Sequence, residues 1–212
     1  MKIALASDVV SPFCWMACQQ VEYAMAQFPE VEFELELMPF QVTPGLPLDY
    51  TFERYQREHM TLTFGNMAAV KDMLRQVTAM GAEHGCEFNL DKLTVWPNSR
   101  RAHGLWALGE TPEQRWKLHK DLCQAHFQHG QNLNDIELLA EIGERHGLVA
   151  EQVKSTLRDE AYIDKILMRV EQTRQLGINS VPTLILNDQY RVQGAQGREQ
   201  LAATIEQILA KH

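Results

Sequence analysis

Hydrophobic and polar positions follow three different patterns within the first forty residues. Residues 3–6, Ile-Ala-Leu-Ala, form a short apolar run that predicts a buried strand. Apolar residues then recur at steps of three and four up to Phe28, which predicts an amphipathic helix ending near Pro29. Residues 31–37, Val-Glu-Phe-Glu-Leu-Glu-Leu, alternate strictly and predict a second strand. Strand, helix and strand within about 40 residues predict a parallel pair joined by a right-handed crossover, and the acidic face of the second strand predicts a sheet edge.

The middle of the chain is helical in period, with almost no strand signal between about residues 51 and 175. Residues 39–47 hold three prolines and Gly45 and predict a loop that leaves the sheet. Asn134 with Glu137 resembles a capping box, and Gly147 fits the glycine that follows a helix. The predicted helices cover residues 67–86, 99–108, 113–129, 136–146 and 151–176.

The end of the chain returns to strands. Residues 183–186 and 190–192 are apolar or β-prone and flank the turn-like segment 187–189, which predicts a hairpin. A closing helix is expected from about Arg198, with Leu201, Ile205 and Ile208 on one face. Because the helical block lies between two groups of strands, we expect one thioredoxin-like domain, residues 1–50 and 176–212, with an inserted helical subdomain at 51–175.

Composition narrows the classes of function. The 212 residues carry 20 Lys and Arg against 28 Asp and Glu, a formal charge of −8, which argues against a nucleic-acid-binding surface. No apolar run approaches the roughly 18 residues that a membrane span needs, and no signal-peptide core follows Met1. We therefore expect a cytoplasmic protein with no membrane partner, in which the cysteines Cys14, Cys18, Cys86 and Cys123 are free thiols.

Candidate chemistry begins at residues 11–14, Ser-Pro-Phe-Cys, where the first strand gives way to the helix. Ser11 is placed to cap the helix and Pro12 to occupy its first position. Unpaired N–H groups and the positive end of the helix dipole favour an anion there, and a thiolate is such an anion. The same residues are equally explained by helix capping alone. Cys14 and Cys18, four residues apart on a helix, are too far apart to bridge without unwinding it.

These features together resemble the thioredoxin-fold proteins of the DsbA superfamily. The resemblance rests on the strand, the X-Pro-X-Cys helix start, the helical middle and residues 181–183, Val-Pro-Thr, before a late strand, and it runs from Ile3 to near Leu209. The most similar branch contains FrnE-like oxidoreductases, kappa-class glutathione transferases and 2-hydroxychromene-2-carboxylate isomerases. It implies an α/β fold, the thioredoxin fold (βαβ…ββα) with a large all-helical insertion. Dithiol members carry Cys-X-X-Cys, and here Ser11 replaces the first cysteine.

The resemblance also implies roles for the residues of this motif. In the transferases and isomerases a serine at the position of Ser11 hydrogen-bonds the sulfur of glutathione, so glutathione is expected as a cosubstrate, with Pro12 and Phe13 beside it. Cys14 matches the resolving cysteine of dithiol members. Without a cysteine at position 11, Cys14 has two possible roles. It either exchanges as a single thiol with glutathione or is a small buried hydrophobic residue.

Further residues are implied downstream. Pro182 matches the cis-proline of thioredoxin-fold proteins, where the backbone of Val181 would pair with an extended thiol ligand; a trans proline opening a strand is the alternative. Ala195 and Gln196 stand where the transferases use a Ser-Asp pair for the γ-glutamyl carboxylate, so that contact is weakened. Asn98 matches an asparagine that faces the active site, or it is only a helix cap. His126 and His129 lack further ligands in a metal pattern, so we expect a solvated helix face and no metal.

Three functions follow from these residues. The first is a glutathione-dependent transferase or isomerase in which Ser11 stabilises the glutathione thiolate and the helical lid holds a small apolar or aromatic substrate. The second is a monothiol thiol-disulfide oxidoreductase that uses Cys14. The third is a non-catalytic protein that binds a peptide or thiol. A homodimer is compatible with all three.

Overall fold

The computed structural model describes residues 1–211 of the chain. The strands are β1 (Lys2–Ser7), β2 (Glu34–Pro39), β3 (Thr183–Leu186) and β4 (Tyr190–Gln193). The helices are α1 (Pro12–Ala26), α2 (Phe52–Tyr55), the π-helical turn η1 (Gln56–Met60), α3 (Thr61–Phe64), α4 (Met67–Glu83), the 3₁₀ turn η2 (Leu90–Lys92), α5 (Arg100–Ala107), α6 (Pro112–Phe127), α7 (Ile136–Arg145), α8 (Ala150–Arg158), α9 (Glu160–Gln175) and α10 (Arg198–Leu209).

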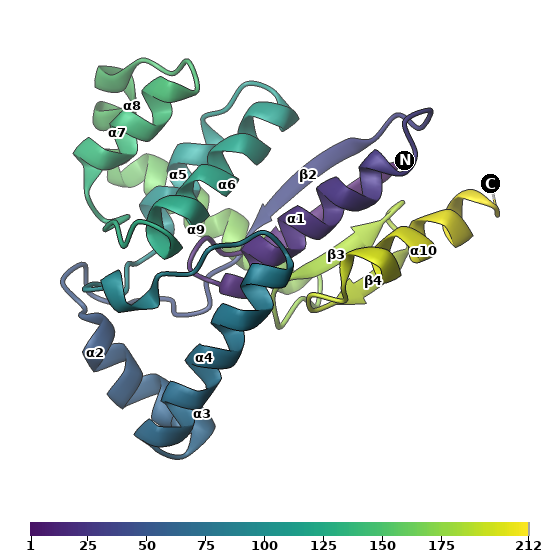
Figure 1. The fold of residues 1–212 in the computed structure, drawn as a ribbon. Coiled ribbons are helices and arrows are strands. Elements are labelled where there is room, and N and C mark those ends of the chain that lie inside the picture. Colours follow the sequence, from purple (N-terminus) through teal and green to yellow (C-terminus); the bar gives the residue numbers. More distant parts are fainter. Residues whose placement is uncertain (212) are drawn as a thin grey trace.

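The strands form one mixed sheet in the order β2-β1-β3-β4 (Figure 1). β1 runs parallel to β2, from the pair Lys2–Glu34 to the pair Ser7–Pro39, and antiparallel to β3. β2 is therefore an edge strand, as its charged face predicts, although its paired part begins at Glu34 and not at residue 31. The predicted hairpin is also present, with Asn187 and Asp188 in the left-handed region at φ 48° and 56°.

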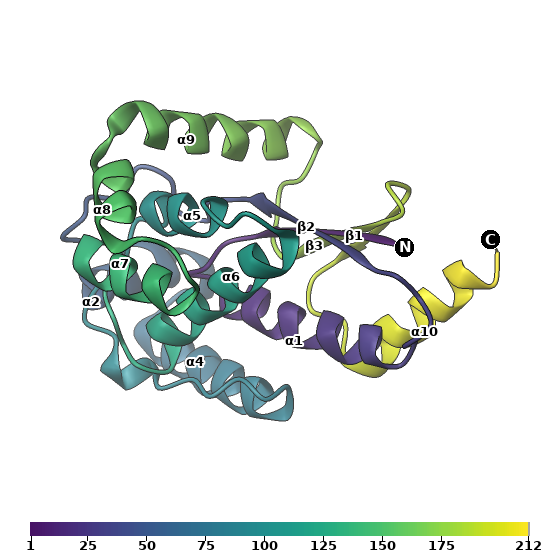
Figure 2. The ribbon, with the colours of Figure 1, turned by 90° about the horizontal axis from the view of Figure 1, so that it is seen from above.

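The two faces of the sheet have different covers (Figure 2). In β1, Ile3 and Leu5 point to the face covered by α1 and α10, while Ala4 and Ala6 point to the opposite face, beside α9. This division follows from the two-residue period of a strand. The small alanines leave room for Phe40, whose ring lies 4.2 Å under the guanidinium of Arg174 from α9.

The helices α2 to α9 lie between β2 and β3 in the chain, so the α/β thioredoxin fold with a helical insertion is confirmed. One buried cluster runs from the sheet through α1 into α5, α6 and α7, and includes Leu5, Trp106, Leu122 and Ile142. The sheet and the inserted helices therefore share a hydrophobic core. Across residues 1–211, no helix is both long enough and apolar enough to cross a bilayer.

The prediction of one helix over residues 151–176 is wrong. The segment is divided into α8 and α9 at Asp159, whose backbone is extended at φ −76° and ψ 107°. The Asp159 side chain accepts a hydrogen bond from the N–H of Ala161 at 3.0 Å, so it starts a new helix. The buried residues change phase at the break: Leu157 and Ile163 are six positions apart, which is not a helical spacing, whereas the buried residues within each helix recur at three or four.

The predicted cap at Asn134 is also wrong by one residue. The N-cap of α7 is Asp135, whose carboxylate accepts from the N–H of Glu137 at 3.0 Å. Asn134 is buried and its side-chain oxygen accepts from the N–H of Asn98 at 3.1 Å. Its side chain serves a long-range contact and is therefore not available for the cap.

Candidate active site

Ser11 lies between the end of β1 and the start of α1. It occupies the N-cap position with an extended backbone, yet its hydroxyl makes no capping hydrogen bond. Pro12 at the first helical position has no N–H to offer, and the first turn is closed by Cys14 N–H donating to the Ser11 carbonyl at 3.0 Å. The prediction that the Ser11 side chain caps the helix is therefore wrong, and the hydroxyl lies at the positive end of the helix, within hydrogen-bonding reach of the Cys14 sulfur.

Cys14 is fully buried on the sheet side of α1. The N–H of Asp8 donates to its sulfur at 3.5 Å. Burial raises the pKa of the Cys14 thiol to about 11, and hydrogen bonds from Ser11, from the Asp8 N–H and from Ser7 offset only part of that effect. At neutral pH the group is a protonated thiol without access to solvent. These properties fit the alternative in which Cys14 is a small buried hydrophobic residue.

A polar network lies beneath the start of α1. The Asp8 carboxylate accepts from the N–H of Val42 at 2.8 Å and lies 3.4 Å from Nε2 of His103. The indole N–H of Trp106 can only donate, and it does so to Nδ1 of His103 at 3.0 Å. His103 therefore carries its proton on Nε2, which donates to the Phe40 carbonyl at 2.8 Å. Asp8 and His103 hold the chain after β2 against the start of α1.

All four cysteines are free and buried. Cys18 and Cys123 lie 3.7 Å and 3.8 Å from Nδ1 of His119, whose Nε2 lies 2.8 Å from the Ser7 hydroxyl. Burial lowers the pKa of His119 to about 3, so the imidazole is neutral at physiological pH. This cluster belongs to the core between α1 and α6 and has no opening to solvent.

The sheet register places Pro182 opposite the end of β1, the strand that leads into the start of α1. Thr183, the next residue, pairs with Ala6 near the end of β1. The Val181–Pro182 peptide bond is cis. Over residues 1–211, no hydrogen bond to the Val181 backbone is found, whereas the Pro182 carbonyl accepts from the N–H of Gly194 at 2.8 Å. That bond brings the segment of Ala195 and Gln196 close to Pro182, and the Gln196 amide bonds to the carbonyl of Gln193.

Asn98 has internal partners for its side chain. Its oxygen accepts from Nε2 of Gln41 at 2.9 Å and from the N–H of Arg100 at 3.2 Å, and its amide donates to the Leu46 carbonyl at 2.8 Å. Only 6% of the residue is exposed. Asn98 thus ties the loop after β2 to the start of α5 and does not line the cavity next to Ser11.

That cavity has a volume of 540 Å³ and opens beside Ser11, Pro12 and Phe13. Its other walls come from the loop after β2, from α2, η1, α3 and α4, and from Trp96 and Phe127. The Tyr55 ring stacks on Trp96 at 4.0 Å with 5° between the planes. The wall residues on helix α2 and the turn η1 could not be identified from the sequence, because these short elements lack a long periodic pattern. The π-helical turn itself is a form enriched at functional sites.

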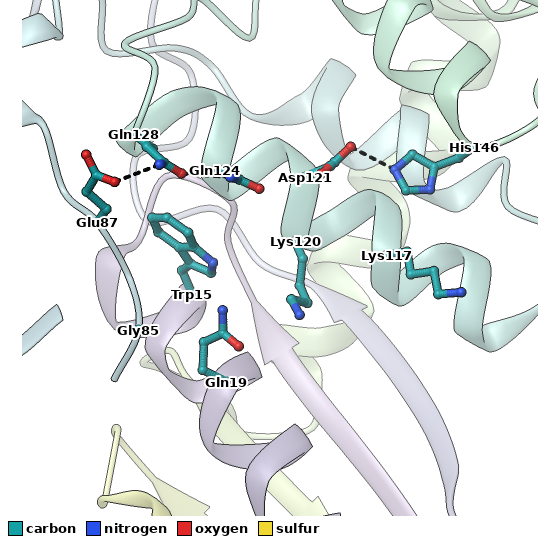
Figure 3. A pocket seen from close by; sticks show the side chains of 10 residues that line it. All are labelled: Trp15, Gln19, Gly85, Glu87, Lys117, Lys120, Asp121, Gln124, Gln128 and His146. Carbon is teal, nitrogen blue, oxygen red and sulfur yellow. Dashed lines mark hydrogen bonds and ion pairs between the residues drawn. The ribbon is translucent and has the colours of Figure 1, made fainter. Parts of the chain in front are cut away.

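A second cavity, of 450 Å³, lies between α1 and α6 and is polar (Figure 3). In it, His146 pairs with Asp121 at 2.8 Å and Gln128 donates to Glu87 at 2.8 Å. Trp15 is the neighbour of Cys14, but it points to this side of α1. No residue predicted for the site lines this cavity, so the chemistry is expected at Ser11.

The prediction that His126 lies on a solvated helix face is wrong. His126 is fully buried, with its ring 5.6 Å from that of Trp96, and Nε2 has no hydrogen-bond partner. Burial lowers its pKa to about 4. His129 is exposed, so the two histidines do not share an environment. Within residues 1–211, no three His, Cys, Asp or Glu side chains gather as metal ligands.

The parallel β1–β2 pair, the antiparallel β3–β4 hairpin and a proline segment beside an X-Pro-X-Cys helix start define a thioredoxin-fold protein. The chain belongs to the DSBA-like thioredoxin domain family, whose model matches residues 2–206. The family expected from the sequence is therefore confirmed.

Individual relatives agree with this assignment. The protein YwbO of Bacillus subtilis (strain 168) is 26% identical over 200 residues, which cover 93% of this chain and 92% of YwbO. Among solved structures, a probable DsbA oxidoreductase from Streptomyces coelicolor has a TM-score of 0.87 at 24% identity, covering 100% of this chain and 91% of that chain. A 2-hydroxychromene-2-carboxylate isomerase has a TM-score of 0.75 at 14% identity, covering 100% and 97%.

The cytosolic disulfide reductase DsbM from Pseudomonas aeruginosa, solved with GSH, has a TM-score of 0.69 at 14% identity. The match covers 99% of this chain and 100% of that chain. At these identities the solved structures establish the fold of this chain, which agrees with its membership of the DSBA-like thioredoxin domain family.

Proposed function

We propose that the chain is a glutathione-dependent transferase or isomerase in which Ser11 stabilises the glutathione thiolate. The observation that carries the proposal is the contrast between Ser11 and Cys14. Ser11 lines an apolar cavity and has a hydroxyl that does not cap its helix. Cys14 is fully buried, and its pKa is raised to about 11. The only side chain of the motif that both can donate to a thiolate and reaches a cavity is therefore Ser11.

The chemistry follows from this placement. The Ser11 hydroxyl would donate to the glutathione sulfur, and the helix dipole would lower the pKa of that thiol. The sulfur then forms a bond to an electrophilic carbon of a substrate in the cavity. In a transfer, a leaving group departs from that carbon with the bonding pair; in an isomerisation, the C–S bond breaks again and glutathione is released. The DsbM structure solved with GSH supports glutathione as the thiol.

Val181 would hold the backbone of the cosubstrate. Its N–H and carbonyl have no hydrogen bond within residues 1–211, and the register of β3 places it next to the end of β1. An extended cysteine residue of glutathione would pair with it as a short added strand. Ala195 and Gln196 offer the γ-glutamyl carboxylate backbone N–H groups and one amide, and no charged group.

The test combines calorimetry with turnover. Reduced glutathione should bind without adding mass, and Ser11→Ala should lower kcat/KM with 1-chloro-2,4-dinitrobenzene by about 10- to 100-fold, the worth of one hydrogen bond to a charged group. Ser155→Ala is a matched control, because Ser155 is exposed on α8 and bonds only to Gln152 of its own helix.

The alternatives give different results. If Cys14→Ala abolished turnover while Ser11→Ala left it unchanged, and oxidised glutathione added one glutathione mass to Cys14, the monothiol oxidoreductase would replace this proposal. If reduced glutathione did not bind at all, the chain would be a thioredoxin-fold protein for another thiol or peptide.

A further inference from the structure

The cavity beside Ser11 has no charged side chain in its wall. Among residues 1–211, no Lys, Arg, Asp or Glu lines it. The titratable side chains of the wall are Tyr55 and His59, whose rings stack on each other at 5.4 Å. A ligand with a carboxylate would lose its hydration here and gain no cation, which is a large penalty for an ion.

A buried carboxyl group lies directly behind this wall. Asp8 is fully buried, and it accepts hydrogen bonds from the N–H groups of Val42 at 2.8 Å and Val10 at 3.4 Å. Both valines line the cavity. The pKa of Tyr55 is raised to about 12 by burial and, to a smaller extent, by the electrostatic field of Asp8. That field opposes a second negative charge.

The shape of the wall favours a flat ligand. The rings of Phe52, Tyr55 and Trp96 lie nearly parallel to one another, with 5° to 20° between their planes. Phe13 and Phe64, at the mouth, are 36% and 41% exposed, and Leu62 is 83% exposed. Exposed apolar side chains at the entrance of an apolar cavity mark a binding surface and give an apolar molecule a path inward.

We propose that this cavity binds uncharged, planar, aromatic molecules and rejects their carboxylates. The assignment deepens the proposed function, since such a molecule would be the electrophilic substrate beside Ser11. It differs from what the named isomerase relative takes, because that name specifies a carboxylate. Binding to the cavity needs no glutathione, so the assignment is testable separately from the reaction.

The test uses two probes that share one ring system. 2-Acetylnaphthalene is uncharged and 2-naphthoate is its anionic counterpart, and both are titrated against the full chain by fluorescence without glutathione at about pH 8, where an ordinary imidazole is neutral. We expect the ketone to bind and the naphthoate to bind at least about tenfold more weakly. Equal affinities, or no binding of either probe, would overturn the assignment.

A cation placed in the wall should reverse the preference. Thr63 is exposed on α3 and lines the cavity, so Thr63→Lys should improve naphthoate binding about tenfold and change ketone binding by less than about threefold. Thr204→Lys, the same change on α10, should affect neither. Equal gains in the two variants would show a general effect of net charge and overturn the assignment. Glutathione calorimetry on the same samples reports separately on the proposed function.

Discussion

Two buried residues that are three positions apart in the chain differ in what their side chains face. Ser11 borders the cavity, whereas the Cys14 sulfur faces the interior of the sheet and receives the N–H of Asp8. A thiol with a pKa of about 11 is ionised in roughly one molecule in a thousand at pH 8. Thiol-disulfide exchange requires an ionised thiol that a disulfide can reach, and Cys14 meets neither requirement.

This difference predicts slow alkylation. In the folded chain, we expect iodoacetamide to label Cys14 at least about 100-fold more slowly than in urea, because both the thiolate fraction and access are reduced. The rate should rise with pH towards about 11, the pKa of the buried group. Mass spectrometry of timed samples measures it, with the urea-unfolded chain as the reference in which all four cysteines react. Equal rates in both states would restore the monothiol function.

His126 predicts a pH-dependent stability. Its pKa is about 4 in the folded chain against an ordinary 6.5, so between these values the unfolded chain binds more protons and the free energy of unfolding falls as the pH falls. At pH 5 this costs about 2 kcal/mol relative to neutral pH. His126→Phe removes the titration and the unpaired Nε2 while keeping an aromatic ring against Trp96.

Urea denaturation at about pH 7 and about pH 5 measures the effect. Between these two pH values the free energy of unfolding of the wild type should fall by about 2 kcal/mol more than that of the variant. His119, whose pKa is lowered to about 3, titrates in both proteins and therefore cancels from the comparison. If the two proteins lost stability in parallel, the buried neutral state of His126 would be contradicted.

The break between α8 and α9 is made by one side chain. Asp159 caps α9 through Ala161, and its extended backbone ends α8. Asp159→Ala should lower the free energy of unfolding by about 1 kcal/mol, the usual worth of an N-cap. Asp164→Ala, the same change at an exposed position inside α9, is the control for lost charge. Equal losses in the two variants, measured by urea denaturation, would show that Asp159 does not act as a cap.

Helices with a long periodic pattern could be predicted from the sequence, whereas helix caps and short irregular turns could not. α4, α6 and α7 match their predicted ranges to within a few residues at each end, since each has enough turns to show a period. The caps depend on tertiary contacts: Asn134 is used by Asn98, and so Asp135 takes over the cap. The π-helical turn that forms part of the cavity wall has no sequence pattern of its own.

The fold could be predicted from the sequence because the order of strands and helices agreed with the motif at each end of the site. The cavity could not be predicted, because its walls join residues from Val10 to Phe127 through packing alone. Asp8 was missed for a similar reason. It directly follows β1, a place where ligand sites are common, but only the fold shows that its partners are Val42 and His103.

The molecule retains the surroundings of a dithiol site, but the side chain at position 11 carries an oxygen in place of the first sulfur. Cys14 lies behind the helix start, the segment before β3 lies next to the end of β1 in the sheet register, and the residue at position 11 sits at the positive end of α1. Ser11→Cys replaces one oxygen by sulfur at the place where a thiolate is most stable. We therefore expect this variant to form a disulfide with Cys14 and to catalyse the reduction of insulin by dithiothreitol.

Mass spectrometry after equilibration with glutathione buffers would show the loss of two hydrogens when that disulfide forms, and its reduction as reduced glutathione increases. The wild type should show neither the mass change nor insulin reduction, and adding Cys14→Ala to Ser11→Cys should stop at a mixed disulfide with glutathione. A Ser11→Cys variant that stayed as two free thiols under oxidising buffers would mean that the burial of Cys14 forbids exchange altogether. In that case Cys14 would belong to the hydrophobic core in this chain, and the site would depend on the hydroxyl of Ser11 alone.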